Sequence, residues 1–131
     1  MPASPEKKLN NTQAIAVVDD DESVRAAVSG MVESFGFSVG TFESAEEFLQ
    51  SGRAASTSCL ILDVQMPGTS GVELHNQLVS SGHRIPTIFV TAFPDARVRE
   101  RVLRAGAVCF LSKPFARDDL LGCIRTALEA G

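Results

Sequence analysis

The side chains best suited to chemistry in this 131-residue chain each follow an apolar run. Three aspartates at 19–21 follow AIAVV, Asp63 follows CLIL, Thr91 follows TIFV, and Lys113 comes shortly after AVCFL. Carboxylates that crowd together repel one another, which raises their pKa values unless a cation lies between them. Oxygen ligands with positions left for water suit Mg²⁺, which often bridges to a phosphate. The acids therefore favour a magnesium site next to a phosphoryl group.

The other residues of this set fit the same chemistry. A carboxylate such as Asp63 can act as a nucleophile and form an acyl phosphate. Lys113 can balance the charge of a phosphoryl oxygen, and the Thr91 hydroxyl can donate a hydrogen bond to one. Phosphoryl transfer requires in-line positioning, charge neutralisation and little else from a protein. Each residue alone has an ordinary structural explanation, and only the four segments together, in this order, indicate a site.

These segments can meet only if the apolar runs are neighbouring strands. Stretches with helical spacing of apolar residues alternate with five short apolar runs, at residues 14–18, 37–42, 59–62, 87–90 and 107–111. This alternation predicts an α/β fold with a parallel sheet, right-handed crossovers and helices on both faces. Ligands of such sheets bind beyond the carboxyl ends of the strands, where all four segments end.

Composition restricts the class of protein further. Hydrophobic residues make up 44% of the chain, which is enough for one domain at 13–131 behind a polar, flexible lead-in at 1–12. The formal net charge of −4 argues against direct binding of nucleic acid. No apolar run is long enough to cross a bilayer, and the N-terminus has no apolar signal core. We therefore expect a cytoplasmic protein that does not associate with membranes.

The cysteines and histidines do not form a recognisable metal motif, since no close pairs occur. His75 and His83 are isolated, and surface or structural roles are expected for both. Three cysteines lie within apolar stretches, and we expect buried, reduced thiols at Cys59, Cys109 and Cys123.

Four segments resemble the receiver domain of bacterial two-component response regulators. They are VVDDDESVR (17–25), LILDVQMPGTSG (60–71), IPTIFVTA (85–92) and FLSKPF (110–115). The resemblance covers about residues 14–128 and implies a doubly wound (βα)5 fold with the flavodoxin-like strand order 2-1-3-4-5. The segment TFESAEEFL (41–49) is similar to the subgroup whose receivers often precede a helix-turn-helix output domain.

The resemblance also implies roles for the site residues. Asp63 would be the phosphoacceptor, supplied by a sensor histidine kinase or a phosphotransfer protein, and Lys113 would assist the transfer. Asp20 and Asp63 would bind Mg²⁺ directly, Asp19 would bind it through water, and Gln65 would contribute its backbone carbonyl. Asp21 lies one place beyond the acidic pair of the family and is left outside the core site.

A second group of residues would transmit the signal. Thr91 would be the switch hydroxyl and Phe110 the switch aromatic, and the Lys113–Pro114 peptide bond would be cis. In the segment DARVRERVLRAG (95–106), three arginines recur at helical spacing: Arg97, Arg101 and Arg104. They form either a solvated basic face or a docking surface for an acidic partner or a twin receiver, which would give a phosphorylation-dependent homodimer.

Three other functions remain open at this point. A receiver-like scaffold could bind partners without phosphorylation. A phosphatase of the haloacid dehalogenase type also uses a strand-end aspartate with Mg²⁺, but it needs a second acid where this chain has Gln65. A carrier of FMN would need a phosphate-binding loop after the first strand, where three aspartates would repel phosphate. We expect a signalling switch and not a turnover enzyme, in a receiver that is cut from a longer DNA-binding regulator and not a stand-alone one.

Overall fold

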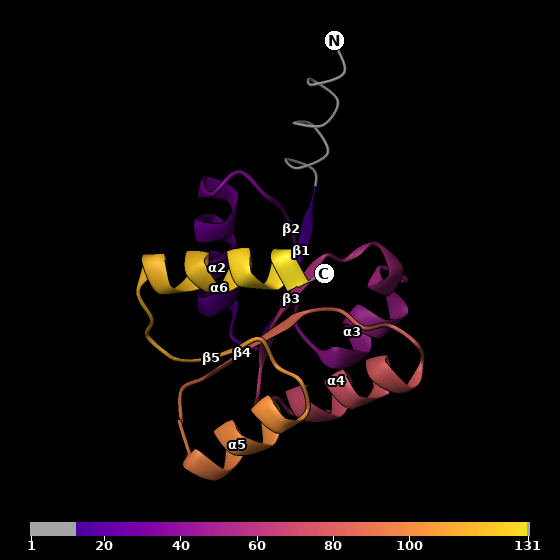
Figure 1. The fold of residues 1–131 in the computed structure, drawn as a ribbon. Helices are drawn as coiled ribbons and strands as arrows, with labels where there is room; N and C mark the ends of the chain where they lie inside the picture. Colours follow the sequence, from indigo (N-terminus) through magenta and orange to yellow (C-terminus); the bar gives the residue numbers. More distant parts are fainter. Residues whose placement is uncertain (1–12, 131) are drawn as a thin grey trace.

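The computed structural model describes residues 13–130, so the lead-in predicted at 1–12 lies outside the described residues. The strands are β1 (Ala14–Val18), β2 (Ser38–Phe42), β3 (Cys59–Asp63), β4 (Thr87–Thr91) and β5 (Cys109–Ser112). The helices are α2 (Glu22–Ser34), α3 (Ala45–Gln50), α4 (Gly71–Ser80), α5 (Ala96–Arg104) and α6 (Arg117–Ala130), with a short 3-10 helix at Ala54–Ser56. Strands and helices alternate along the chain, as Figure 1 shows.

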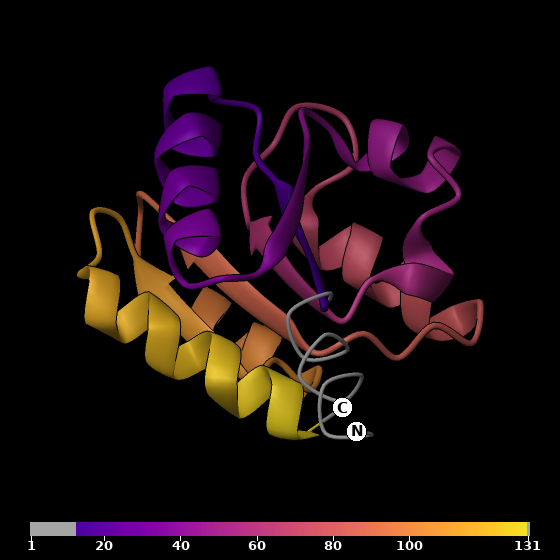
Figure 2. The same ribbon diagram turned by 90° about the horizontal axis from the view of Figure 1, so that it is seen from above.

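The five strands form one parallel sheet in the order β2-β1-β3-β4-β5. The predicted α/β fold and its strand order are therefore confirmed. Helices α2 and α6 cover one face of the sheet, and α3, α4 and α5 cover the other (Figures 1 and 2). Because all strands run the same way, their carboxyl ends meet at one edge, where the predicted site residues lie.

An apolar layer lies on each side of the sheet, and neighbouring residues of a strand alternate between them. On β3, Leu60 and Leu62 enter the layer beneath α3, α4 and α5, whereas Ile61 enters the layer beneath α2 and α6. All three side chains are almost completely buried. Burying a side chain of this kind contributes about 1.5–3 kcal/mol, which explains why the central strands read as unbroken apolar runs.

Side chains at the helix starts accept hydrogen bonds from backbone N–H groups that the helices leave unpaired. Asp95 begins α5 by accepting a hydrogen bond from Arg97 N. Ser44 accepts from Glu47 N at the start of α3, but the Glu47 carboxylate accepts from Glu43 N, the residue before the cap.

The complete reciprocal capping box lies instead at the start of α4. Ser70 Oγ accepts from Glu73 N at 3.2 Å, and Glu73 Oε1 accepts from Ser70 N at 2.8 Å. This box fixes the direction of the helix that follows the β3 turn, so it stabilises the loop beside the site.

The predicted boundaries of four strands were wrong by one or two residues. The strands predicted at 59–62 and 87–90 each extend one residue further, to Asp63 and Thr91. The strand predicted at 107–111 is β5 at Cys109–Ser112, because Ala107 N still bonds to Val102 O at the end of α5. Gly106, with φ of +104°, makes the turn that separates helix from strand. The strand predicted at 37–42 begins one residue later, at Ser38.

The expectation of three reduced cysteines was also wrong. Cys109 on β5 and Cys123 on α6 form a disulfide with a Cα–Cα distance of 6.0 Å, and Cys59 is a buried free thiol. The two partners face each other only because β5 packs against α6, and a separation of 14 residues in the sequence does not reveal that. Among residues 13–130, no helix has the length and apolar character needed to cross a membrane.

Candidate functional site

Asp63 ends the central strand β3 and is only 5% exposed. The turn that follows fixes its position, because Gly71 N donates to Val64 O at 3.0 Å and Gln65 N donates to Asp63 Oδ1 at 3.2 Å. Gly71 has no room for a side chain, since a Cβ atom there would collide with the carbonyl oxygen of Asp63. The sequence therefore needs glycine at this place to hold the acid at the strand end.

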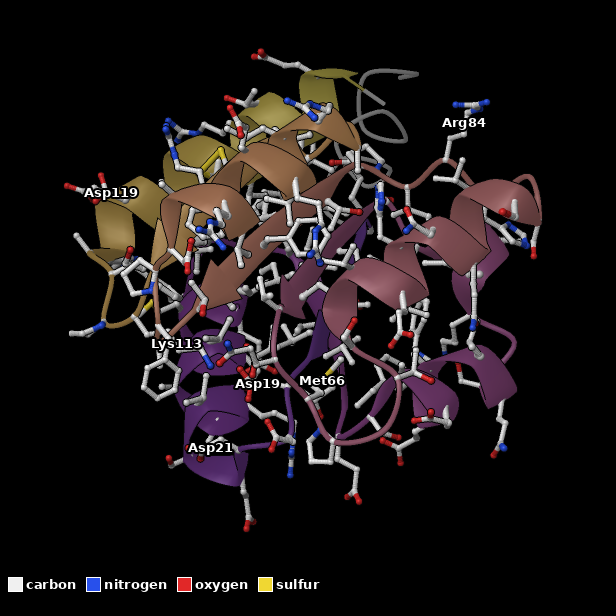
Figure 3. The ribbon with its side chains drawn as sticks, turned by 90° about the horizontal axis from the view of Figure 1, so that it is seen from below. Asp19, Asp21, Met66, Arg84, Lys113 and Asp119 are labelled. Carbon is white, nitrogen blue, oxygen red and sulfur yellow. A yellow bond between two sulfur atoms is a disulfide. The ribbon has the colours of Figure 1, made fainter. Side chains whose placement is uncertain are left out.

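Lys113 brings a positive charge to the same edge. Its Nζ lies 2.7 Å from Asp19 Oδ2 and 3.4 Å from Asp63 Oδ2, and Figure 3 shows Lys113 beside Asp19. Its backbone N donates to Thr91 O at 2.8 Å, which ties the end of β5 to the end of β4. Burial opposes the charge of Lys113, but the hydrogen bond to Asp19 and the charges of Asp63 and Asp19 outweigh it and raise the pKa of the ammonium group.

Three carboxylates meet in front of this lysine. Oxygens of Asp19, Asp20 and Asp63 lie within 4.8 Å of one another, with Asp19 and Asp63 buried and Asp20 exposed. Burial, and then the charge of Asp19, raises the pKa of Asp63 to about 6 even though Lys113 acts in the opposite direction. A group of hard oxygen donors with an unfavourable excess of negative charge fits Mg²⁺, which would relieve that repulsion.

Asp21 has a different task. It caps α2 by accepting from Ser23 N at 2.9 Å and from Ser23 Oγ at 2.7 Å, and the hydrogen bond from the Ser23 hydroxyl is the main reason that the pKa of Asp21 is lowered. Figure 3 shows Asp21 at the start of α2, away from Lys113. Asp21 nevertheless lines the same pocket as Asp63, which has a volume of about 230 Å³.

Thr91 and Phe110 lie on the side of the sheet that faces α5. Thr91 ends β4 and is 1% exposed, and its Oγ1 accepts a hydrogen bond from Phe93 N at 3.0 Å. Phe110 pairs with Phe89 across β4 and β5 and packs, partly buried, against the layer that contains Val102. Thr91 is thus held by the loop that follows it, and Phe110 is held by the apolar layer.

The three arginines of α5 point away from the core. Arg97, Arg101 and Arg104 are exposed, while Val102 from the same helix is fully buried. Within residues 13–130, none of the three forms an ion pair with another residue of the chain. All three arginines are therefore exposed and unpaired within the described residues, and their role as a partner surface stays a prediction.

Other residues support the site without having been identified from the sequence. Arg25 Nη1 donates to Asp19 O at 2.7 Å and anchors the β1 end. Glu46 on α3 accepts from Thr69 Oγ1 at 2.6 Å and so fixes the β3–α4 loop. Arg25 lies inside VVDDDESVR, where its place on the first helix turn was a usable signal, but 23 residues separate Glu46 from Thr69 and no local pattern connects them.

Known proteins resemble this chain in sequence and in fold. The family model of the response regulator receiver domain matches residues 15–125. The chain is 42% identical over 120 residues to the response regulator protein TodT of Pseudomonas putida, covering 92% of this chain and 53% of TodT. It is 37% identical over 121 residues to the transcriptional regulatory protein TdiR of Thauera aromatica, covering 92% of this chain and 53% of TdiR. A solved structure of the response regulator StyR has 42% identity and a TM-score of 0.84, with 90% of this chain and 60% of that chain covered.

The chain belongs to the family of response regulator receiver domains. The resemblance recognised in its four segments is confirmed. Proteins of this family are signalling proteins of two-component systems and do not turn over an external substrate. Receiver domains bind Mg²⁺ at an acidic pocket, and this chain has a cluster of three aspartates at the carboxyl edge of its sheet. The chain spans about half the length of the curated relatives that it matches.

Proposed function

We propose that this receiver domain is a phosphorylation-dependent switch that accepts a phosphoryl group on Asp63 in the cytoplasm. The donor would be a histidine phosphorylated on a sensor kinase or on a phosphotransfer protein. The observation that carries the proposal is the position of Lys113 Nζ, 2.7 Å from Asp19 Oδ2 and 3.4 Å from Asp63 Oδ2. One cation thus stands beside a nearly buried nucleophile, which is the arrangement that transfer of an anionic group requires.

In the transfer step, an Asp63 oxygen attacks phosphorus while the bond from phosphorus to the donor nitrogen breaks. The electron pair of that bond stays on the donor nitrogen, and the imidazole leaves as a neutral group because its other ring nitrogen carries a proton before the bond breaks. Gln65 N holds Oδ1 of Asp63, so Oδ2, which faces Lys113, is the better placed nucleophile. With a pKa of about 6, Asp63 is mostly ionised at neutral pH and able to attack.

The acidic residues of the site would hold Mg²⁺ in different ways. The ion, when bound, would supply positive charge to the phosphoryl oxygens. Asp20 is exposed and has no ion-pair partner in the described chain, so it is suited to direct ligation. Asp19 is already engaged by Lys113, so a contact through water suits it better. Gln65 would add its backbone carbonyl from the turn after Asp63.

The response begins when the phosphoryl group on Asp63 attracts the Thr91 hydroxyl. The Oγ1 atom then exchanges its present bond with Phe93 N for a bond to a phosphoryl oxygen. This movement frees space on the α5 side of β4, into which Phe110 rotates from its partly buried place. The result is a population shift between two arrangements of the surface formed by α5, β5 and α6.

That surface would carry the output. The arginines Arg97, Arg101 and Arg104 are exposed on α5, and the acids Asp118 and Asp119 are exposed at the start of α6. Across a two-fold axis, the acids of one copy can face the arginines of the other, which supports a phosphorylation-dependent homodimer. Because TdiR is a transcriptional regulatory protein, we further propose that the dimer controls a DNA-binding output domain.

The decisive experiment measures uptake of phosphate. Wild-type protein is incubated with acetyl phosphate and Mg²⁺ and weighed intact, with Asp63→Asn as the test and Asp21→Asn as the control on the same rim. We expect one phosphoryl mass on wild type and on Asp21→Asn, and none on Asp63→Asn. A phosphoryl mass that persists on Asp63→Asn would refute the assignment of the acceptor.

The same experiment separates the other functions. A scaffold that works without phosphorylation would take up no phosphate in any variant. A phosphatase would release inorganic phosphate over many turnovers from an added phosphate ester. One phosphoryl group per chain, lost slowly as the acyl phosphate hydrolyses, is the result that distinguishes a switch from both.

A further inference from the structure

The disulfide between Cys109 and Cys123 joins the edge strand of the sheet to the last helix. It lies in the layer beneath α2 and α6, on the opposite side of the sheet from Phe110. The sulfur–sulfur bond is drawn in yellow beside α6 in Figure 3. The 14-residue separation encloses Phe110 and Lys113, so the two proposed functional residues of β5 and its loop lie inside one covalent ring.

We propose that Cys109 and Cys123 are a reversible redox-modification site that responds to hydrogen peroxide. In the first step, the Cys109 thiolate attacks one peroxide oxygen, the O–O bond breaks, and a sulfenic acid and water form. In the second step, the Cys123 sulfur attacks the Cys109 sulfur, and the sulfenic oxygen leaves as a second water. Two thiols are oxidised by two electrons, the peroxide is reduced to two waters, and both thiol protons end in water.

The exposure of the two cysteines assigns the order of these steps. Cys109 is partly exposed, whereas Cys123 is only 8% exposed, so a peroxide molecule reaches Cys109 first and Cys123 resolves the intermediate. The Cα–Cα distance of 6.0 Å lies within the range that a disulfide spans without backbone movement. The folded chain therefore holds both sulfurs ready for bond formation.

Cys59 provides the contrast within the same layer. It is fully buried in the central strand, has no cysteine partner, and burial raises the pKa of its thiol to about 12. A thiol in this state is neither accessible nor ionised, so it does not react with a peroxide. The exposure and pairing of the three cysteines therefore assign the reactivity to Cys109 and Cys123, and Cys59 serves as an unreactive control in the same chain.

Oxidation changes how β5 is held. As an edge strand, β5 has backbone partners only on β4, and none of its residues is fully buried. The disulfide adds a covalent link to α6, which removes freedom from the strand that carries Phe110. Disulfides in the cytoplasm are usually transient and redox-sensing, which fits a bond that opens when thiol reductants prevail.

The first test concerns the chemistry and needs no phosphorylation. Fully reduced wild-type protein is treated with hydrogen peroxide, freed of peroxide, unfolded in guanidinium chloride so that every remaining thiol is accessible, alkylated, and weighed intact. We expect the loss of two hydrogen atoms and one alkylated thiol in wild type, with a 109–123 crosslink in the peptide map that dithiothreitol removes. Cys59→Ser should form the same bond, and Cys109→Ser and Cys123→Ser should not. Three alkylated thiols in peroxide-treated wild type, or oxygen addition without a crosslink, would overturn the proposal.

The second test concerns the effect on the fold and uses wild type alone, so no variant has to fold. Hydrogen exchange is compared between the oxidised and reduced forms of the unphosphorylated protein. Amides of β5 and the middle of α6 should exchange roughly tenfold more slowly when oxidised, while amides of β1 keep their rate. Equal exchange of β5 in both forms would refute the structural effect and leave the proposed phosphorylation of Asp63 unaffected, since that is measured separately.

Discussion

The central strands and the edge strand of the sheet differ in how firmly they hold their residues. β3 and β4 are buried at all five positions, and they end at Asp63 and Thr91. β5 is partly or fully exposed at all four positions, and it carries Phe110 and leads to Lys113. The proposed nucleophile Asp63 thus lies on a strand that has neighbours on both sides, and Phe110, the aromatic residue expected to rotate, lies on a strand that is bonded on one side only. Precise chemistry and mobile response require these opposite environments.

The largest effect should come from removing the cation that joins the two regions. Lys113→Met leaves Asp19 and Asp63 without their shared partner and should lower the free energy of unfolding by about 3 kcal/mol at pH 7.5 without Mg²⁺. Urea denaturation measures this loss, with Arg104→Met as a control at an exposed cation. In the double variant Lys113→Met/Asp63→Asn, the loss should be much smaller. Equal losses of the free energy of unfolding in the single and double variants would show that Lys113 does not compensate the charge of Asp63.

The next effect tests how tightly the central turn is built. Gly71→Ala forces a Cβ against the carbonyl oxygen of Asp63 and should cost about 2–3 kcal/mol, together with slower phosphate uptake. Gly122→Ala in α6 is the matched control, because nothing lies within 4 Å of its Cβ and helix propensity should stabilise it by up to about 1 kcal/mol. Chemical denaturation and phosphorylation rates measure both variants. Equal stability and equal phosphorylation rates of the two alanine variants would show that the turn after Asp63 is not tightly packed.

The buried charge of Asp63 should make stability depend on pH. Its pKa is about 6 in the folded protein and near 3.8 when unfolded, so the folded state binds the proton more tightly. That contribution to stability is complete below pH 3.8 and is lost as the pH rises through 6. Asp63→Asn should therefore be more stable than wild type by about 1–2 kcal/mol above pH 7 without Mg²⁺, a value reduced for solvent at the open rim.

The advantage of Asp63→Asn should shrink as the pH falls towards 4. Urea denaturation across this range with a chelator present gives the measurement, and Asp21→Asn serves as the comparison. The pKa of Asp21 is lowered by its hydrogen bonds, so that variant should lose stability above the acid range. A constant advantage of Asp63→Asn at every pH would point to packing instead of charge.

A smaller effect should separate the central chemistry from the response at the edge. Thr91→Ala removes a hydroxyl whose one bond in the described structure is accepted from Phe93 N, so stability should fall by only about 1 kcal/mol. Uptake of phosphate should persist, while most of the phosphorylation-induced change at α5 and β5 disappears. Hydrogen exchange with and without acetyl phosphate reads this change. A response equal to that of wild type would place the switch in other residues.

The smallest effect per residue should come from the exposed arginines. Reversal of Arg97 and Arg101 to Glu should weaken the phosphorylated dimer by about 0–1 kcal/mol per ion pair, and rising salt should weaken the wild-type dimer in the same way. Sedimentation of the phosphorylated protein measures the dimer fraction, with Arg53→Glu as the control, because Arg53 is exposed and lies outside α5, β5 and α6. An unchanged dimer fraction would exclude this surface.

Residues near one another in the sequence were the easiest to predict. The unbroken apolar runs and the acids at their ends predicted β3, β4 and the place of Asp63, because burial on both faces leaves a strong sequence signal. The limits of β5 were harder, since an edge strand has partly exposed residues and a weaker pattern. The buried central strands that position Asp63 are therefore predicted well from the sequence. The partly exposed edge strand that carries Phe110 is predicted less well.

Contacts between distant segments could not be predicted from the residues. The bond between Glu46 and Thr69 and the disulfide of Cys109 with Cys123 depend on how helices lie on the sheet, and neither has a local signature. The chemical types of Asp19, Asp63 and Lys113 suggested a joint site, but only the structure gives the distances that make one ammonium group serve two carboxylates.

Asp19 and Lys113 are in contact but lie 94 positions apart in the sequence, so the ribosome makes them at different times. Synthesis proceeds from the N-terminus, so both buried acids exist before the residue that neutralises them. A nascent chain that ends after β4 has the carboxylates but not the cation, and its acidic edge repels itself. Arrival of β5 supplies both the last strand and the missing charge. Under the proposed function, a chain that ends before β5 lacks the lysine that the transfer uses, so the ability to accept a phosphoryl group depends on completion of the domain.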